Sequence, residues 1–255
     1  MTATEIALVT GAGSGIGRAT ALRLAERGAA VALLDRDADG LAATAAAIRD
    51  GGGSALELSG DVSQEGDLAA AVERAVAELG PLRTAVACAG IEVTGTAPEM
   101  DLDDWHRVLA VNLTGVFLTA RHAIPAIAAA GGGSFVALSS DAGVQGASGF
   151  AASCASKHGV IGLVRSLALD HGPEGVRCNV VCPGFVETPM ADRLFAGAPS
   201  GERERWQRLV PLGRFAQPQE VAASIAFLSS PDGRYVNGQV HVIDGGSTAG
   251  YFEPA

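Results

Sequence analysis

Short runs of apolar and β-branched residues alternate with longer alanine-rich stretches along most of the chain. The short runs are continuously apolar, which is typical of strands buried on both faces of a parallel sheet. The longer stretches repeat apolar residues at helical spacing, and proline or glycine stands near several of their ends. The pattern predicts strands at 6–10, 30–35, 55–59, 84–88, 133–138, 176–182 and 239–243. It predicts helices at 16–27, 39–49, 64–79, 102–130, 153–171 and 219–229.

Strands and helices in this order favour one doubly wound α/β domain over residues 1–255, with a seven-stranded parallel sheet and helices on both faces. The segment 187–214 departs from the alternation, because it follows a strand but contains no further strand pattern. It is either a surface excursion of two short helices or a substrate lid. We favour the lid, since ligands bind at the carboxyl ends of strands in such sheets.

Composition narrows the class of protein. The chain is 48% hydrophobic and 18% charged, which is enough apolar material for a sizeable core and excludes disorder. A net charge of −10 argues against nucleic acid as a partner. We find no uninterrupted apolar run of membrane-spanning length and no leader-like start, and expect a cytoplasmic protein without membrane contact. The cysteines and histidines lack ligand spacing, so no metal site is expected.

A glycine-rich loop, TGAGSGIG at 10–17, joins the first predicted strand to the first helix. Gly11, Gly15 and Gly17 allow a tight turn and a close backbone approach to a pyrophosphate, and the helix N-terminus attracts the anion. Asp35 ends the second strand, where a carboxylate accepts hydrogen bonds from both ribose hydroxyls of NAD and repels a 2′-phosphate. The neighbouring Arg36 could meet a 2′-phosphate, but no basic residue stands in the loop, so we expect NAD.

These motifs together resemble the short-chain dehydrogenase/reductase family, with its Rossmann fold, over essentially the whole chain. TGAGSGIG, Asp61-Val62, ACAG at 87–90, VNLTGVF, ALSS, SCASKHG and PGFVETPM stand in the order of the family's motifs. The resemblance implies catalytic roles for Asn112, Ser140, Ser153 and Lys157. It implies cofactor contacts from Gly11, Ser14, Gly15, Ile16, Gly17, Asp35, Arg36, Asp61, Val62, Cys88, Ala89, Gly90, Lys157, Pro183, Gly184, Val186 and Thr188.

The resemblance gives each catalytic position a role. Lys157 would lower the pKa of a proton-transferring group and bind the ribose, Ser140 would hold the substrate oxygen, and Asn112 would hold a water in the proton relay. Lys157 is the one lysine in the chain, since every other basic residue among the 18 is arginine. A compact ammonium with a tunable pKa suits this site, and a guanidinium could not replace it.

One departure lies at the centre of the family's mechanism. Ser153 stands where the family has its catalytic tyrosine, and the two tyrosines of the chain, Tyr235 and Tyr251, lie far along the sequence. A serine hydroxyl is a much weaker acid than a phenol and reaches less far. We considered the neighbouring Cys154, the tail residue Tyr251 and a water held by Ser153 and Lys157 as substitutes, and favour the water. Restoring the phenol with Ser153→Tyr is expected to raise turnover by about 10²–10⁴-fold.

Three functions are compatible with these motifs. The favoured one is an NAD-dependent oxidoreductase that interconverts a secondary alcohol and a ketone, with its proton relay altered by Ser153. The alternatives are a Tyr→Ser variant made to trap a complex, and an NAD(H)-binding sensor or structural subunit. We expect a small uncharged substrate, because the predicted pocket is apolar apart from Glu92 and Glu187; its apolar members are Ile91, Val93, Val144, Phe150, Phe185, Met190 and Phe195. Helices 102–130 and 153–171 resemble those that pair between subunits in the family, and the resemblance implies a homotetramer.

Overall fold

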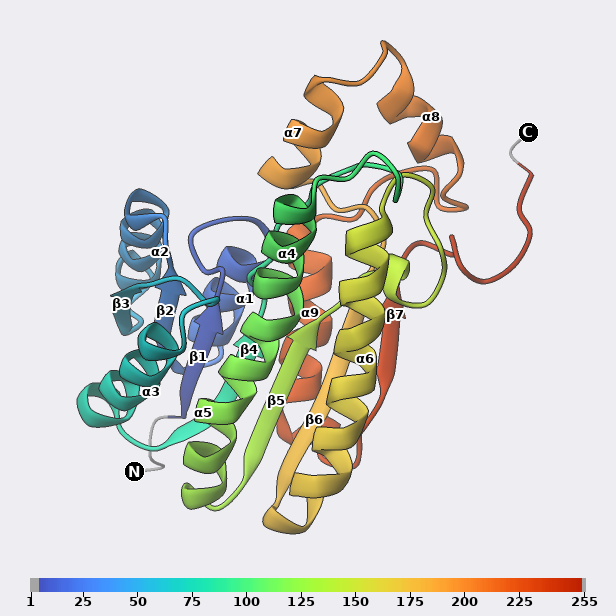
Figure 1. Ribbon diagram of the computed structural model, residues 1–255. Helices are drawn as coiled ribbons and strands as arrows, with labels where there is room; N and C mark the ends of the chain where they lie inside the picture. The colour runs from blue at the N-terminus through green and yellow to red at the C-terminus, as the bar shows by residue number, and fades with distance from the viewer. Residues whose placement is uncertain (1–4, 254–255) are drawn as a thin grey trace.

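The computed structural model describes residues 5–253, and it contains one seven-stranded sheet in the order β3-β2-β1-β4-β5-β6-β7 (Figure 1). All neighbouring strands pair in parallel. The strands are β1 (Ile6–Thr10), β2 (Ala30–Asp35), β3 (Ala55–Ser59), β4 (Leu82–Ala87), β5 (Gly133–Leu138), β6 (Val176–Pro183) and β7 (Val240–Ile243). The strand order reverses between β1 and β4, which is where such sheets bind their ligands.

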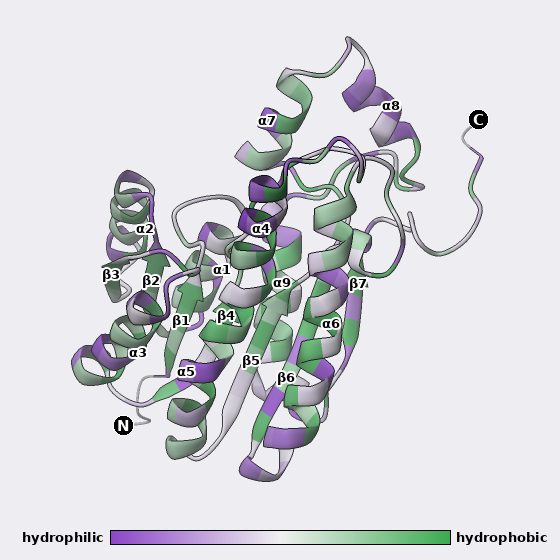
Figure 2. Cartoon of the chain, in the orientation of Figure 1, coloured by the Kyte–Doolittle hydropathy of each residue, from purple (hydrophilic) through white to green (hydrophobic). Residues whose placement is uncertain are grey.

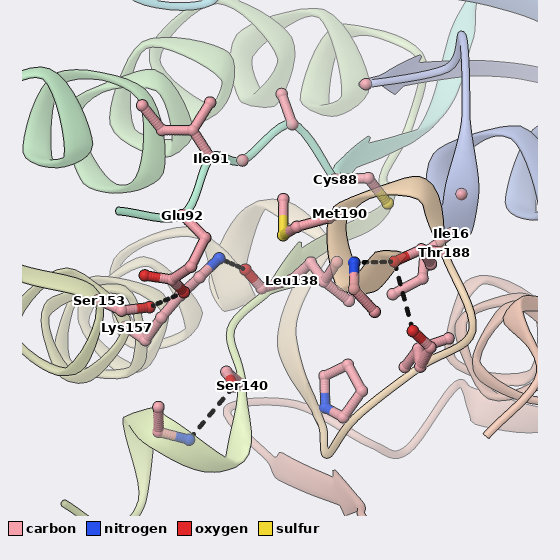
Figure 3. Close-up of a pocket in the computed structure, with 18 of the residues that line it drawn as sticks. Ile16, Cys88, Ile91, Glu92, Leu138, Ser140, Ser153, Lys157, Thr188 and Met190 are labelled. Carbon is pink, nitrogen blue, oxygen red and sulfur yellow. Dashed lines mark hydrogen bonds between the residues drawn. The ribbon is translucent and has the colours of Figure 1, made fainter. Parts of the chain in front are cut away.

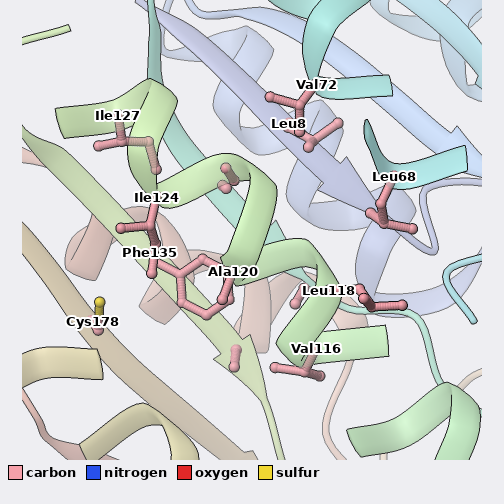
Figure 4. Close-up of a cluster of buried hydrophobic side chains, with 14 of the residues drawn as sticks. Leu8, Leu68, Val72, Val116, Leu118, Ala120, Ile124, Ile127, Phe135 and Cys178 are labelled. Atoms are coloured by element: carbon pink, nitrogen blue, oxygen red, sulfur yellow. The ribbon is translucent and has the colours of Figure 1, made fainter. Parts of the chain in front are cut away.

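Helices cover both faces of this sheet, as the alternation predicts (Figure 1). One face carries α3 (Glu65–Leu79), α5 (Gly115–Ala129) and α6 (Ala151–His171). The other face carries α1 (Gly15–Glu26), α2 (Ala38–Asp50) and α9 (Pro218–Ser229). A hydrophobic core lies on each face of the sheet, and alternate residues of β1 belong to one core or the other. Ile6 and Leu8 pack under α3 and α5, while Ala7 and Val9 pack under α1 and α9. Figure 4 shows the first of these cores.

The long helix predicted at 102–130 is not one regular helix. It consists of α4 (Leu102–Leu109), a π-helical turn η1 (Ala110–Thr114) and α5. Such turns insert an extra residue into an α-helix and often mark functional sites. Asn112 is the buried residue of this turn, a placement that periodicity alone could not predict.

By length and composition, the run Leu102–Ala129 could cross a membrane, with a mean hydropathy of 1.2 in its most apolar window. In the fold, half of that window is buried inside the protein. Val116, Ala123 and Ile127 pack against the sheet, so the apolar face of this helix is used in the core (Figure 4).

The segment 187–214 forms two helices above the carboxyl ends of the strands (Figure 1). They are α7 (Pro189–Ala196) and α8 (Glu202–Arg208). The Thr188 hydroxyl caps α7 by accepting a hydrogen bond from the Ala191 amide at 3.3 Å. The sequence ERERWQR makes α8 strongly hydrophilic, in contrast to the apolar strands below it (Figure 2).

Phe135 on β5 is fully buried at the centre of the core under α5 (Figure 4). Phe135→Ala should therefore lower the free energy of unfolding by about 3–5 kcal/mol, because it removes buried apolar surface and leaves a cavity. Urea denaturation followed by circular dichroism measures the loss. The matched aromatic control is Tyr235→Ala at a fully exposed position, which should change stability by less than about 0.5 kcal/mol. Equal effects of the two variants would contradict this description of the core.

Candidate active site

A cleft of about 610 Å³ opens at the carboxyl ends of β1, β4, β5 and β6. Its floor is the strand-to-helix loop after β1, and its roof includes residues of α7 and α8. Figure 3 shows one of them, Met190 of α7. The cleft therefore lies at the reversal of strand order, where the fold predicts a ligand.

The glycine loop after β1 provides a backbone cradle. Gly11 has φ +67°, in the left-handed region, and a Cβ there would lie 2.8 Å from the Ala89 backbone. A Cβ on Gly17 would collide with the Gly11 carbonyl oxygen. Helix α1 begins at Gly15 with neither a side-chain cap nor an acidic residue in its first turn. The amides of that turn are therefore available to an anion, so the loop fits the pyrophosphate of a dinucleotide.

Asp35 closes the same end of the cleft from the tip of β2. Its Oδ2 accepts a hydrogen bond from the Gly13 amide at 2.9 Å, and its Oδ1 accepts one from the Asp37 amide at 3.0 Å. These bonds hold the carboxylate against the glycine loop. A carboxylate has about four lone-pair sites, so each oxygen keeps the capacity to accept a further hydrogen bond from a ligand.

Thr10 joins the two strands at the switch point. Its hydroxyl oxygen accepts hydrogen bonds from the Cys88 and Ala89 amides, each at 3.2 Å. These two amides do not take part in the hydrogen-bond ladder of the sheet. Strand β4 therefore ends at Ala87, one residue before the predicted end at Cys88. Desolvation raises the pKa of the Cys88 thiol to about 12, so this cysteine stays neutral at the cleft wall.

Lys157 enters the cleft from α6 and is 9% exposed. Its Nζ donates a hydrogen bond to the Leu138 carbonyl at 3.0 Å, at the end of β5 (Figure 3). Burial lowers the pKa of this ammonium, and the charge of Glu92 opposes that shift. A buried amine with a lowered pKa is typical of a functional site.

Ser140 follows β5 and lines the cleft, next to Ser139, whose hydroxyl donates a hydrogen bond to the Lys157 carbonyl of α6 at 2.9 Å. The Ser140 hydroxyl donates a hydrogen bond to Asp141 Oδ1 at 2.8 Å and accepts one from the Ala142 amide at 3.2 Å. Burial raises the pKa of the Asp141 carboxyl, and the bonds from Ser140 and Ala142 partly offset that shift. Ser140 is thus held in place by a neighbour that the sequence analysis did not single out.

Asn112 lies in the π-helical turn and is fully buried beside the cleft. Its Oδ1 accepts a hydrogen bond from the Ile91 amide at 2.9 Å, and its Nδ2 donates one to the Ile91 carbonyl at 3.0 Å. A second Nδ2 contact reaches the Ser156 hydroxyl at 3.4 Å. This amide therefore clamps the chain that follows β4 against α6.

Ser153 projects from the first turn of α6 toward that clamped chain. Its hydroxyl donates a hydrogen bond to Glu92 Oε2 at 2.8 Å, and the Val93 amide donates one to Glu92 Oε1 at 3.1 Å (Figure 3). Sequence analysis named Glu92 only as a charge in the pocket wall. The sequence does contain one local signal for this residue, because Glu92 is a carboxyl residue two positions after the ACAG motif.

The fold brings nearly all of the predicted site residues together. Asn112 lies behind the cleft wall, and the other predicted catalytic and cofactor residues line the cleft. Of the predicted substrate-pocket residues, Val93, Val144, Phe195 and Glu187 do not line it. Val144 is instead exposed, and Phe195 stacks on Phe215 and packs against Phe185 with its ring tilted by 43°. Tyr235 and Tyr251 are exposed and do not line the cleft.

The parallel sheet, the glycine loop and the cleft at the switch point define a dinucleotide-binding protein with a Rossmann fold. The family model described as "Enoyl-(Acyl carrier protein) reductase" matches residues 11–248. The chain belongs to the short-chain dehydrogenase/reductase family, whose members are oxidoreductases that use nicotinamide cofactors. The resemblance stated from the motifs is thereby confirmed.

Similar proteins include two curated dehydrogenases. Cis-4-hydroxycyclohexanecarboxylate dehydrogenase of Sinomonas cyclohexanicum is 44% identical, with 97% of this chain and 98% of that protein covered. Cyclohexanol dehydrogenase of Acinetobacter sp. (strain SE19) is 40% identical, with 96% and 95% covered. Among solved structures, the crystal structure of levodione reductase has a TM-score of 0.93 at 35% identity, with 97% of this chain and 98% of that one covered.

Thr10 offers a test of how the cleft floor is held. Thr10→Val keeps the side chain's shape but leaves the Cys88 and Ala89 amides without their acceptor, which should cost about 1–3 kcal/mol in unfolding free energy. The control is Thr119→Val on α5, where the buried hydroxyl donates to the Gly115 carbonyl that the helix already uses. Chemical denaturation of both variants should show the larger loss for Thr10. A larger loss for Thr119 would contradict this assignment.

Proposed function

We propose that this chain is an NAD-dependent oxidoreductase that interconverts a secondary alcohol and a ketone. The observation that carries the proposal is one cleft with Asp35 and the glycine loop at its ribose end and Ser140 and Lys157 at its other end. Family membership supports the reaction class. The substrate class is supported by relatives named for alcohols, including cyclohexanol and meso-2,3-butanediol.

In this proposal the residues divide the work along the cleft. When bound, the nicotinamide would accept the hydride in the oxidation direction. Lys157 holds the ribose and favours a negative charge on the group that takes the proton. The Ser140 hydroxyl hydrogen-bonds the substrate oxygen, and Asn112 keeps the chain after β4 in position. Asp61 and Val62 border the cleft beyond β3 and would contact the adenine.

We also propose that the segment 187–214 is a lid over the substrate. Met190 and Leu194 of α7 and Trp206 of α8 line the cleft, which supports this role. The segment has internal supports of its own, since Arg203 pairs with Glu187 and Asp192 and lies over the Phe215 ring at 5.6 Å. Apolar residues over the cleft favour an uncharged, moderately hydrophobic alcohol or ketone.

Initial-rate assays test the reaction. The unmodified chain, with NAD⁺ and a panel of secondary alcohols that includes cyclohexanol and 2,3-butanediol, should give an increase in nicotinamide absorbance near neutral pH. Ketones with NADH should give the reverse change. Tight NAD(H) binding without turnover in either direction would favour the sensor or structural subunit instead.

Cofactor choice depends on Asp35. Isothermal titration should show tighter binding of NAD⁺ than of NADP⁺, because a carboxylate repels a 2′-phosphate. Asp35→Ala should weaken NAD⁺ binding and reduce the difference in affinity between NAD⁺ and NADP⁺. Asp39→Ala is the control and should leave both affinities unchanged, because Asp39 is exposed in the first turn of α2 and does not line the cleft. Tighter NADP⁺ binding by the unmodified chain would overturn the assignment.

The proposed assembly is a homotetramer formed through α5 and α6. Phe117 on α5 and Leu169 on α6 are exposed apolar side chains, at 43% and 79% of their surface, which supports an interface there. Light scattering at micromolar protein should therefore give a mass near four times the 25.6 kDa of one chain. Leu169→Asp should lower that mass, and a monomeric mass for the unmodified chain would remove the proposal.

A further inference from the structure

Glu92 and Ser153 form a pair inside the cleft at the position of the missing phenol. Ser153 Oγ donates to Glu92 Oε2 at 2.8 Å, and the Val93 amide donates to Oε1 at 3.1 Å. Both carboxylate oxygens are thus oriented by a donor. The two residues come from different elements, the chain after β4 and the first turn of α6 (Figure 3). The pair is therefore a product of the fold and is not visible as a sequence motif.

Two supports fix the position of the carboxyl group. Asn112 binds both the amide and the carbonyl of Ile91, the residue directly before Glu92. Ser153 and Lys157 are four residues apart on α6, so they lie on one face of the helix. Glu92 therefore shares the cleft with Lys157 and Ser140 (Figure 3).

Accessibility separates the roles of the two partners. Ser153 is 3% exposed, and its hydroxyl proton is committed to Glu92. Glu92 is only partly buried and lines the cleft. A carboxylate can accept a proton at working pH, whereas a serine alkoxide is far too basic to form there. Proton transfer is thus assigned to the Glu92 carboxylate, and Ser153 holds that carboxylate in place.

We propose that Glu92 is the catalytic residue that accepts the substrate's hydroxyl proton in alcohol oxidation and returns it in ketone reduction, with Ser153 as its positioning residue. This inference rests on the proposed function. In oxidation, the substrate O–H bond breaks and its proton binds a Glu92 carboxylate oxygen. The carbon–oxygen double bond forms as the hydride leaves carbon for the oxidised nicotinamide. Reduction reverses each transfer, so the carboxylic acid gives up the proton.

The charges around Glu92 give the proposal a pH signature. Burial raises the pKa of Glu92, and the Ser153 hydrogen bond and the charge of Lys157 lower it in part. The other titratable groups nearby face different partners: Cys88 and Cys182 face Lys157, and Asp141 binds Ser140. Oxidation needs the ionised carboxylate, so its rate rises as pH rises through the pKa of Glu92. Reduction needs the protonated acid, so its rate falls over the same range.

The first test removes the titrating group and keeps its shape. Glu92→Gln should lower single-turnover hydride transfer, measured by nicotinamide absorbance, by about 10²–10⁴-fold, the usual contribution of a placed general acid or base. Affinity for NAD⁺ should change little. The matched control is Glu99→Gln, an exposed carboxylate on the same segment that binds Thr96 and lies outside the cleft. It should leave the rate unchanged.

A second measurement does not depend on turnover. Infrared difference spectra of the protein without added cofactor, recorded against pH, should show a carboxylic acid band that titrates above the ordinary range of glutamate. The band should be absent in Glu92→Gln. Ser153→Ala should move its midpoint, and the low-pH limb of the oxidation rate, to higher pH, because the ionised form loses a hydrogen-bond donor. A serine with a merely structural role would leave both midpoints unchanged.

A double-mutant comparison separates Glu92 from other proton paths. If the carboxyl group fills the role of the phenol, the gain in rate from Ser153→Tyr should be about 10²-fold or more in a Glu92→Ala background. In the unmodified chain the gain should then be much smaller than the 10²–10⁴-fold expected from the sequence alone, because Glu92 already transfers the proton. Equal gains in both backgrounds would mean that Glu92 does not perform the proton transfer that the phenol performs.

The outcomes distinguish the two proposals. Absence of alcohol oxidation by the unmodified chain would overturn the proposed function. Normal oxidation with an unchanged rate and pH profile in Glu92→Gln would overturn the role of Glu92 alone, and would leave a water held at Ser153 as the proton acceptor. A large loss in Glu92→Gln, together with the titrating infrared band, supports Glu92.

Discussion

Desolvation of a single ammonium group is the constraint on which the arrangement of the cleft depends. Lys157 is the one lysine of the chain, and α6 places it in a site where burial lowers its pKa. An unpaired buried charge is costly, so its surroundings must offset the loss of water. The Leu138 carbonyl accepts a hydrogen bond from Nζ, and the Glu92 charge favours the protonated form. Leu138 ends β5 and Glu92 lies in the segment that follows β4, so the parallel sheet brings both partners to one edge.

That edge is assembled by contacts between segments distant in sequence. Thr10 on β1 holds the Cys88 and Ala89 amides after β4, and Asn112 holds Ile91, two residues further along the same segment. Glu92 follows immediately and meets Ser153 on α6. Asn112 lies in the π-helical turn and binds Ile91, so an irregular part of a helix holds the residue directly before the carboxylate. Stability of the fold and geometry of the site are thus properties of the same hydrogen bonds.

The strands and the glycine loop could be predicted from the sequence because their signals are local. Continuous apolar runs located four of the seven strands to the residue, and TGAGSGIG located the phosphate cradle from its own spacing. The interruption at Ala110–Thr114 was missed, because its residues have ordinary helical periodicity. The pair of Glu92 and Ser153 was missed for a different reason. The two residues are 61 positions apart, and only the packing of α6 against the chain after β4 brings them together.

A carboxylate near a buried ammonium could be present for charge compensation alone, so the geometry must decide between compensation and chemistry. To neutralise the buried Lys157 charge, a carboxylate needs only to lie near the ammonium, and it does so most strongly in direct contact. Within residues 5–253, however, no ion pair closer than 4.0 Å joins these two groups, and the Glu92 oxygens are instead held by the Ser153 hydroxyl and the Val93 amide. The donors thus hold the carboxylate at the wall of the cleft, on the face of α6 that carries both Ser153 and Lys157. A carboxylate kept out of direct contact with its counter-ion, and partly open to the cleft, remains free to exchange a proton with a bound alcohol.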